Sequence, residues 1–364
     1  MKTLLVAGAR PNFMKIAPVY HEAANYSEIE CKLVHTGQHY DYDMSQSFFE
    51  DLEIPEPHFF LDAGSGSHAV QTAKIMVAFE EVCKEERPDL VVVVGDVNST
   101  LACSIVAKKM QIKVAHIEAG LRSFDLSMPE EINRMVTDSI ADLFFVTEQS
   151  GVKNLLRDGK PMERIHFVGN VMVDNLFRQV RKLDNGGGVG LSIQSIKPKE
   201  GDYIFLTLHR PSNVDEREKL SEIAEALNEI AVEKPIFFPV HPRTNKMLEM
   251  YGISLSNRIT ILPPLGFKES LCLWKDAALV MTDSGGLQEE TTALGVPCLT
   301  LRENTERPVT VEMGTNVLAG TSRDSIMKAY HQSRLGRTAA ARVPPKWDGH
   351  ASERIWEVIK SLPG

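Results

Sequence analysis

Short apolar runs alternate with amphipathic stretches along nearly the whole chain, and this alternation predicts strands separated by helices. The predicted strands of the first half are TLLVA, CKLVHT, DLVVVVGD, KVAHIE, LFFVT and IHFVGN, and those of the second half are YIFLTL, PIFFPV, RITIL, AALVMTD and PCLTL. Most of these runs are continuously apolar, which is typical of parallel strands that helices cover on both faces. The pattern therefore predicts an α/β fold with doubly wound sheets.

The chain divides into two similar halves. Its 364 residues exceed the size at which one hydrophobic core usually stops growing. Residues 184–201 are glycine-rich and lack periodicity, so we interpret them as a linker rather than a phosphate-binding loop. We expect one Rossmann-like domain over residues 1–183 and another over 202–345, facing a central cleft at the carboxyl ends of the strands. Residues 346–364 contain an amphipathic helix that can pack back on the first domain.

Charge and composition limit the classes of partner. The net charge of −9 argues against nucleic acid, because nucleic-acid affinity comes mainly from Lys and Arg contacts to phosphates. No apolar segment approaches about 18 residues, so we expect no membrane insertion. The five cysteines are scattered without a CxxC pair, which favours reduced thiols in a cytoplasmic protein. No His and Cys spacing is typical of zinc, and no metal is expected.

The first predicted strand is followed by the sequence GARPNFMK. Arg10 and Lys15 lie near the start of the next predicted helix, where unpaired backbone N–H groups favour an anion. A turn with solvated basic residues explains the same sequence about equally well. The spacing is not GxGxxG, which argues against a bound dinucleotide cofactor.

Carboxylates follow two of the predicted strands and begin one predicted helix. Asp96 comes after DLVVVVG, Glu118 ends KVAHIE, and Glu130 lies in MPEEINR. Taken singly, each is explained as a turn residue or as an acid at a helix N-terminus. Their convergence at one sheet edge is, however, the usual layout for acid–base chemistry. Arg122 and Arg134 can keep such acids ionised or bind a substrate phosphate.

Histidine and arginine pairs end two strands of the second half. LTLHRPSN contains His209 and Arg210, and FFPVHPRTN contains His241 and Arg243. A lone histidine is more often structural than functional, but two such strand ends in one domain favour a functional site.

The sequence LVMTDSGGLQEE gives the strongest local signal of the second half. A strand runs through Ser284, Gly285 and Gly286 directly into a helix. The glycines let the backbone approach a phosphate, and the helix N-terminus favours its charge. Glu290 follows about one turn later, where it can accept hydrogen bonds from ribose hydroxyls, and Arg307 follows the next strand.

Taken together, the motifs GARPNFMK, TGQH, GDVNST, HIEAGLRS, PEEINR, LHRPSN, DSGGLQEE and TERP closely resemble those of the non-hydrolysing UDP-N-acetylglucosamine 2-epimerases. They occur in the order of that family and cover nearly the whole chain. The resemblance implies a GT-B-like fold of two Rossmann domains, a cytoplasmic homodimer, a UDP-sugar substrate and no cofactor.

The resemblance also implies roles for individual residues. The sugar and diphosphate would be surrounded by Arg10, Lys15, Asp96, Glu118, Glu130, Arg134 and His209, of which the three acids, Arg134 and His209 are the catalytic candidates. UDP would be bound by Arg210, Ser284, Gly285, Gly286, Glu290 and Arg307, with its uracil near Leu265 and Ser270.

One departure from the family concerns a second substrate molecule that activates many of its members. The region that would hold this molecule reads QHYDYDM here, and the later segment DAGSGSH lacks the usual arginine. Gln38, His39 and His241 remain as second-site candidates, and we expect weak substrate activation.

These residues suit inversion at C2 of a UDP-sugar without nicotinamide. UDP can be eliminated across C1–C2 and added back, which needs acid–base groups on both sides of the ring and a positive cradle for the diphosphate. We therefore expect interconversion of UDP-GlcNAc and UDP-ManNAc through 2-acetamidoglucal. The alternatives are a 2-epimerase of a UDP-diacetamido-sugar uronic acid, a hydrolysing epimerase, a retaining GT-B glycosyltransferase and a non-catalytic UDP-sugar-binding protein.

Overall fold

The computed structural model of the protein describes residues 1–37, 49, 52–186, 191–334 and 342–362. The chain forms two compact units. The first unit comprises Met1–Asn175 and Pro345–Gly364, and the second comprises Leu176–Pro344. Within the described ranges, none of the helices is both long and apolar enough to cross a membrane.

The first unit is built on a seven-stranded sheet with the order β3-β2-β1-β4-β5-β6-β7, and every strand pair in it is parallel. Its strands are β1 (Lys2–Ala7), β2 (Glu30–His35), β3 (Phe59–Phe60), β4 (Leu90–Val94), β5 (Lys113–Ile117), β6 (Leu143–Val146) and β7 (Ile165–Phe167). Its helices are α1 (Arg10–Ala23), α3 (His68–Glu86), α4 (Asn98–Lys109), α5 (Pro129–Ile140), α6 (Gln149–Arg157), the 3-10 turn η1 (Met162–Arg164), the start of α7 (Val171–Asp184), and α16 (Ala351–Lys360). The order reverses between β1 and β4, which makes this pair the switch point of the sheet.

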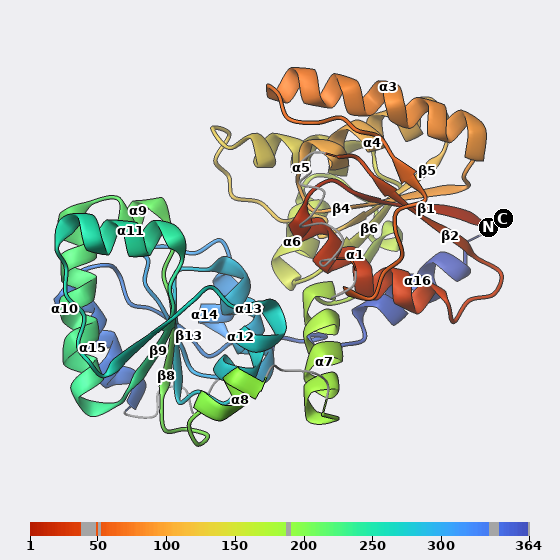
Figure 1. The fold of residues 1–364 in the computed structure, drawn as a ribbon. Coiled ribbons are helices and arrows are strands. Elements are labelled where there is room, and N and C mark those ends of the chain that lie inside the picture. Colours follow the sequence, from red (N-terminus) through yellow and green to blue (C-terminus); the bar gives the residue numbers. More distant parts are fainter. Residues whose placement is uncertain (38–48, 50–51, 187–190, 335–341, 363–364) are drawn as a thin grey trace. The chain divides into compact units, whose positions relative to one another are not determined.

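Two hydrophobic clusters cover the two faces of this sheet. Side chains alternate along β1, so Leu5 belongs to one cluster and Leu4 to the other. The first cluster includes residues of α1 and α16, and the second includes Phe79 of α3 and Val106 of α4. In Figure 1, α3 and α4 accordingly lie on one side of the strands and α1 and α16 on the other. Because both faces are covered, a strand such as β4 is buried at every position and its sequence is continuously apolar.

The C-terminal helix α16 packs within the first unit. Its Trp356 is fully buried and donates a hydrogen bond from Nε1 to the carbonyl oxygen of Val19 on α1, over 2.6 Å. Asp174 on α7 accepts hydrogen bonds from the backbone N–H groups of Ala351 and Ser352, at 3.0 and 2.6 Å. A carboxylate at a helix N-terminus satisfies N–H groups that lack helical partners, so Asp174 fixes the start of α16.

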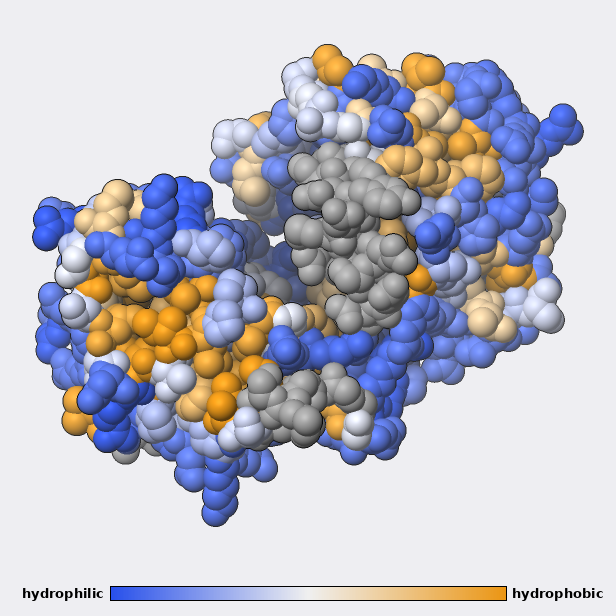
Figure 2. Space-filling view, in the orientation of Figure 1, coloured by the Kyte–Doolittle hydropathy of each residue, from blue (hydrophilic) through white to orange (hydrophobic). Residues whose placement is uncertain are grey.

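The second unit is built on a six-stranded sheet with the order β10-β9-β8-β11-β12-β13, again with parallel pairs. Its strands are β8 (Ile204–Thr207), β9 (Ile236–Pro239), β10 (Ile259–Leu262), β11 (Leu279–Thr282), β12 (Cys298–Thr300) and β13 (Asn316–Leu318). Besides most of α7, its helices are α8 (Leu191–Ile196), α9 (Pro211–Val214), α10 (Arg217–Glu233), α11 (Pro242–Tyr251), α12 (Phe267–Trp274), α13 (Gly285–Leu294), α14 (Pro308–Glu312) and α15 (Arg323–Arg334). Its switch point lies between β8 and β11. The edge strand β10 exposes Ile261, and Figure 2 shows hydrophobic residues over the strands of this unit below α11.

The predicted α/β fold with two doubly wound parallel sheets is confirmed. Each predicted strand is present, and two further strands, β3 and β13, were not predicted. β3 has only two residues, and β13 has three and begins with Asn316, so neither gives a recognisable apolar run. The segment 184–201, which we interpreted as a linker without periodicity, contains the short helix α8.

Candidate functional site

An ion pair lies at the switch point of the first unit. Lys15 of α1 and Glu118, directly after β5, bring Nζ and Oε2 to 2.6 Å, with side chains only 15% and 9% exposed. Gly95 lies beside them with φ +70°, and a Cβ at this position would come within 3.4 Å of both charged atoms. A separation of 3.4 Å is an ordinary van der Waals contact, so glycine at residue 95 serves the backbone conformation rather than the space.

Glu118 itself has an uncommon backbone conformation. Its φ is +69°, in the left-handed region that residues with a side chain rarely adopt. Such conformations cost free energy and cluster at functional sites. The adjacent backbone is fixed by a hydrogen bond from the N–H of Ala119 to the carbonyl oxygen of Phe145, at 3.2 Å. The strain supports a functional role for this carboxylate.

A second carboxylate–arginine pair follows β4. Asp96 accepts a hydrogen bond through Oδ2 from Nη2 of Arg134, and Nη1 of the same guanidinium lies 2.8 Å from Oε2 of Glu131. The predicted acid Glu130 is partly buried in the first turn of α5, and its carboxylate makes no hydrogen bond or ion pair with the part of the chain that the structure describes. Asp96 and Arg134 are thus joined, whereas Glu130 stands apart from them.

Glu131 organises the loop between β5 and α5. It is buried and accepts hydrogen bonds from the backbone N–H groups of Ser123 and Phe124, at 2.9 and 3.1 Å. Although burial disfavours its charge, these hydrogen bonds and Arg134 hold the pKa of Glu131 below its usual value. In the sequence, Glu131 follows Glu130 in MPEEINR and is explained only as a second acid at a helix N-terminus. Arg134 follows three residues later, and side chains at this spacing on a helix can pair, so the spacing was the sequence signal for the contact between Glu131 and Arg134.

Arg122 has different partners from those we expected. Its guanidinium donates to Asp138 at 2.6 Å, to Asp158 at 2.8 Å and to the carbonyl oxygen of Leu121 at 2.8 Å. The side chain is only 4% exposed. The expectation that Arg122 binds a substrate phosphate or pairs with one of the three predicted acids is therefore wrong, because its donors are used inside the unit.

The loop after β1 is held by a residue that sequence reasoning did not single out. Asn12 accepts hydrogen bonds through Oδ1 from the backbone N–H groups of Gly8 and Ala9, at 3.3 and 3.0 Å. Arg10 is the first residue of α1. Gln38 and His39, two of the second-site candidates, lie outside the described residues.

The second unit contains a pocket of about 320 Å³ beside its switch point. Apolar side chains of β9, the loop after β10 and α12 form much of its wall. Seven of the predicted binding residues line it, namely His209, His241, Leu265, Ser270, Ser284, Gly286 and Glu290. The pocket therefore brings together residues from four separate parts of the sequence.

Buried Asp283 orients His209 toward this pocket. Its Oδ1 lies 2.9 Å from Nδ1 of His209, and its Oδ2 accepts from the backbone N–H groups of His209 and Arg210 at 2.9 and 2.7 Å. Although burial disfavours its charge, the hydrogen bond from His209 helps to hold the pKa of Asp283 below its usual value. Since Nδ1 faces Asp283, Nε2 is the ring nitrogen that a ligand in the pocket can meet. We had assigned no role to Asp283.

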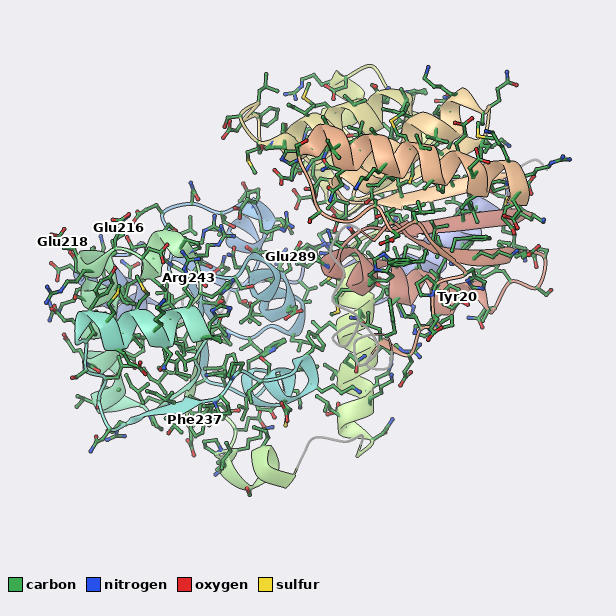
Figure 3. The ribbon with its side chains drawn as sticks, turned by 45° about the horizontal axis from the view of Figure 1, so that its top comes forward. Tyr20, Glu216, Glu218, Phe237, Arg243 and Glu289 are labelled. Carbon is green, nitrogen blue, oxygen red and sulfur yellow. The ribbon has the colours of Figure 1, made fainter. Side chains whose placement is uncertain are left out.

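His241, the third second-site candidate, also lines this pocket. It caps the N-terminus of α11, where its Nδ1 accepts a hydrogen bond from the backbone N–H of Arg243 at 3.2 Å. Arg243, labelled in Figure 3, pairs with Asp215, with Nε and Oδ1 2.8 Å apart. The ring centroids of His209 and His241 are 6.2 Å apart, so the two histidines border the same space.

The N-terminus of α13 gives the pocket an anion-binding edge. Ser284 is the residue that precedes the helix, and its backbone N–H donates to Oγ1 of Thr282 at 2.9 Å. Apart from the neighbouring residues and the backbone of the helix itself, no atom of the described residues lies within 4 Å of the Cβ positions that side chains at Gly285 and Gly286 would take. The backbone of the first helical turn is therefore open to a ligand, and helix N-termini favour negative charge.

Two neighbouring glutamates on α13 differ in their surroundings. Burial and the charge of Glu289 raise the pKa of Glu290, which lines the pocket, to about 8. Glu289, labelled on α13 in Figure 3, pairs through Oε1 with Nε of Arg307 at 3.0 Å. Arg307 is thus joined to the helix that carries Glu290.

A buried amide joins α13 to the loop that carries Arg307. Gln288 is fully buried and accepts hydrogen bonds through Oε1 from Thr305 at 2.6 Å and from Asn316 at 3.3 Å. At the start of the same loop, Arg302 contacts both carboxylate oxygens of Glu306, at 2.7 and 2.8 Å, and lowers the pKa of Glu306 to about 2. The partners of Gln288 are 17 and 28 residues away in the chain, so no local sequence pattern reveals these contacts.

Among the residues that the structure describes, no cluster of three or more His, Cys, Asp and Glu side chains is arranged to hold a metal ion. Two parallel α/β units whose polar side chains gather at their switch points are typical of enzymes that bind nucleotides.

Comparison with known proteins gives the family. The family model described as UDP-N-acetylglucosamine 2-epimerase matches residues 21–360. The chain is 43% identical to a UDP-N-acetylglucosamine 2-epimerase of Methanocaldococcus jannaschii over 99% of each chain. It is 39% identical to the UDP-2,3-diacetamido-2,3-dideoxy-D-glucuronate 2-epimerase of Pseudomonas aeruginosa over the whole of each chain. The crystal structure of the M. jannaschii UDP-GlcNAc 2-epimerase in complex with UDP-GlcNAc and UDP aligns over the whole of both chains with a TM-score of 0.83 and 40% identity. The chain belongs to the UDP-N-acetylglucosamine 2-epimerase family, and the resemblance found in its motifs is confirmed.

Proposed function

We propose that this protein is a UDP-N-acetylglucosamine 2-epimerase that interconverts UDP-GlcNAc and UDP-ManNAc. The observation that carries the proposal is the 43% identity, over 99% of both chains, to the M. jannaschii enzyme of that name. The two switch points supply what the reaction needs, namely acid–base groups in the first unit and a nucleotide pocket in the second.

The second unit would bind the UDP portion of the substrate. The open N-terminus of α13 suits the diphosphate, because its backbone N–H groups and helix dipole favour anions. Glu290 suits the ribose hydroxyls, and the apolar wall around Leu265 suits the uracil ring. His209 borders the same pocket and, with Nδ1 fixed by Asp283, would face the diphosphate with Nε2.

The first unit would carry out proton transfer at C2 of the sugar. One carboxylate removes the C2 proton, the electron pair forms the C1=C2 double bond, and the C1–O bond to UDP breaks. Return of a proton to the opposite face of C2 and of UDP to C1 gives the epimer. This sequence requires two positioned groups, and Glu118 beside Lys15 and Asp96 beside Arg134 supply two carboxylates.

Incubation with UDP-GlcNAc, followed by NMR of the products, tests the proposal. The expected result is a mixture of UDP-GlcNAc and UDP-ManNAc whose ratio is the same when the reaction starts from UDP-ManNAc. Release of UDP with free sugar as the main product would instead identify a hydrolysing epimerase. Binding of UDP-GlcNAc without any turnover would identify a UDP-sugar-binding protein.

Substitution of the three predicted acids tests the acid–base assignment. We expect the substitutions Asp96→Asn, Glu118→Gln and Glu130→Gln each to lower turnover about 10²-fold or more, since positioned acid–base groups contribute about that much. Asp125→Asn is the matched control. Asp125 is an exposed residue of the loop between β5 and α5, and its carboxylate accepts hydrogen bonds from the backbone N–H and the hydroxyl of Ser127. Near-normal turnover in all three acid variants would refute the assignment.

A second candidate substrate is a UDP-diacetamido-sugar uronic acid, because the chain is 39% identical to the P. aeruginosa epimerase of such a compound. The two substrates differ at C3 and C6 of the sugar and carry the same acetamido group at the reacting C2. Comparison of kcat/KM for the two compounds decides between them. A larger value for the uronic acid would assign the protein to that substrate.

We also propose that the protein acts in the cytoplasm as a homodimer, as the resemblance to its family implies. Its cysteines are free thiols, and all except Cys31 are buried, which suits a reducing compartment. Light scattering of the purified protein tests the assembly, and a monomeric mass in the presence of activity would contradict it.

A further inference from the structure

A buried carboxylate on α5, Asp138, lies outside the set of acids that the reaction uses. The residue is 1% exposed, and both of its carboxylate oxygens have partners. Oδ1 lies 2.7 Å from Nδ1 of His116, while Oδ2 accepts hydrogen bonds from the backbone N–H of Gly120 at 3.0 Å and from Arg122 at 2.6 Å. Three groups from β5 and the loop after it therefore converge on one side chain.

His116 extends this set of contacts to the neighbouring strand. Its Nε2 lies 2.8 Å from the carbonyl oxygen of Gly95, and a carbonyl oxygen can only accept a hydrogen bond. Although burial disfavours its charge, His116 and Arg122 hold the pKa of Asp138 below its usual value, so its carboxylate also acts as an acceptor. His116 thus bridges the carbonyl oxygen of Gly95 and the carboxylate of Asp138.

The resulting chain of hydrogen bonds joins two turns that carry candidate acids. It begins at the carbonyl oxygen of Gly95, which directly precedes Asp96, passes through His116 and Asp138, and ends at the N–H of Gly120, two residues after Glu118. The turn at Glu118 also has an uncommon backbone conformation, with φ +69° at a residue that carries a side chain. Residues in such conformations keep them only where the surroundings impose them.

We propose that Asp138 is a positioning residue that, through His116 and the N–H of Gly120, fixes the spacing between the turns of Asp96 and Glu118. Asp138 touches neither substrate nor reacting atom. Its effect on catalysis rests on the proposed function, since it acts by holding the two carboxylates where proton transfer needs them. A displacement of about 1 Å at a reacting group can lower a rate about 10²-fold.

The chain offers a matched control for a purely structural role. Asp142 accepts a hydrogen bond from the backbone N–H of Val114, near the start of β5, at 2.8 Å, and pairs with Lys108 at the same distance. Asp142 therefore contacts the same strand, β5, as Asp138 does, but at the end of the strand that is farther from Glu118. Loss of this carboxylate perturbs the unit without touching either acid-bearing turn.

The experiment compares the variants Asp138→Asn, His116→Gln and Asp142→Asn in the full-length protein. We expect kcat to fall about 10²-fold in the first two while the Kd for UDP, measured by calorimetry, stays within about twofold. Asp142→Asn should keep the kcat of the wild type. The proposal is overturned if folded Asp138→Asn keeps the wild-type kcat, or if the kcat of Asp142→Asn falls as much as that of Asp138→Asn.

Hydrogen exchange of the Gly120 amide supplies a readout that does not depend on turnover. We expect exchange in the segment 118–124 to be at least about tenfold faster in Asp138→Asn than in the wild type, and unchanged in Asp142→Asn. Equal exchange in all three proteins would overturn the proposal. If wild-type protein does not epimerise UDP-GlcNAc, the proposed function fails, and hydrogen exchange alone decides whether Asp138 holds the two turns.

Discussion

Replacement of Glu290 by glutamine should change how the stability of the protein depends on pH. Burial and the charge of Glu289 raise the pKa of Glu290 from 4.5 to about 8. Between these values the folded protein keeps a proton that the unfolded chain has released. The free energy of unfolding of the wild type therefore falls as the pH rises through this window. Glutamine has no proton to lose, so the variant should lack this contribution.

The size of the effect follows from the pKa of Glu290. One pKa unit corresponds to about 1.4 kcal/mol, so a pKa of about 8 instead of 4.5 sets an upper limit of about 5 kcal/mol. Water in the adjoining pocket screens the charge, and we expect a gain of about 1–3 kcal/mol for Glu290→Gln above pH 8, with none below pH 4.5. Above pH 8 the same variant should also bind UDP more weakly, because it loses the charged acceptor for the ribose.

Urea unfolding of both proteins at a series of pH values from 4.5 to 9 measures this difference. Glu289→Gln is the informative control, since removal of the neighbouring charge should lower the pKa of Glu290 and move the fall in stability to lower pH. Parallel curves for the wild type and Glu290→Gln would refute the reasoning, because they would mean that the folded protein does not retain the proton.

Two further predictions concern the nucleotide site. Arg307→Ala should weaken UDP binding about tenfold, because a charge-assisted contact to the ligand is lost. Calorimetry measures the Kd for UDP, and an unchanged Kd would mean that the diphosphate does not bind at Arg307. Asp283→Asn should lower the free energy of unfolding by about 1–3 kcal/mol near pH 7, since it removes the charged acceptor of several hydrogen bonds. This loss of stability should become smaller as the pH falls through the lowered pKa of Asp283, because the wild-type carboxyl then becomes uncharged like the asparagine. A loss that is independent of pH would contradict the role of Asp283 as a charged acceptor.

The fold could be predicted from the sequence because its signal is local. Parallel strands covered on both faces are apolar at nearly every position, so runs such as LVVVV in β4 and LFFV in β6 can be recognised from the sequence alone. The same logic fails for β3 and β13, which are too short to form a run. Their hydrogen bonds come from neighbouring strands that are distant in the sequence, and no local pattern records them.

The candidate site could be predicted only in part. Residues after strands, such as Asp96 and His209, are recognisable because parallel strands bring their carboxyl ends to one edge of the sheet. The partner of each side chain is not recognisable in this way. Arg122 and Arg134 looked equivalent in the sequence, yet Arg122 is enclosed by Asp138 and Asp158, whereas Arg134 reaches Asp96.

The central claim is that the protein removes and returns the proton at C2 of a UDP-sugar, and the isotope content of the product tests it most directly. Wild-type protein is incubated with UDP-GlcNAc in D₂O without added metal or nicotinamide, and the product is examined by NMR. A carboxylate that accepts the proton exchanges it with solvent before another group supplies one to the opposite face. The account predicts UDP-ManNAc with deuterium at C2, accompanied on long incubation by traces of UDP and 2-acetamidoglucal. Retention of the original C2 proton through many turnovers would contradict it.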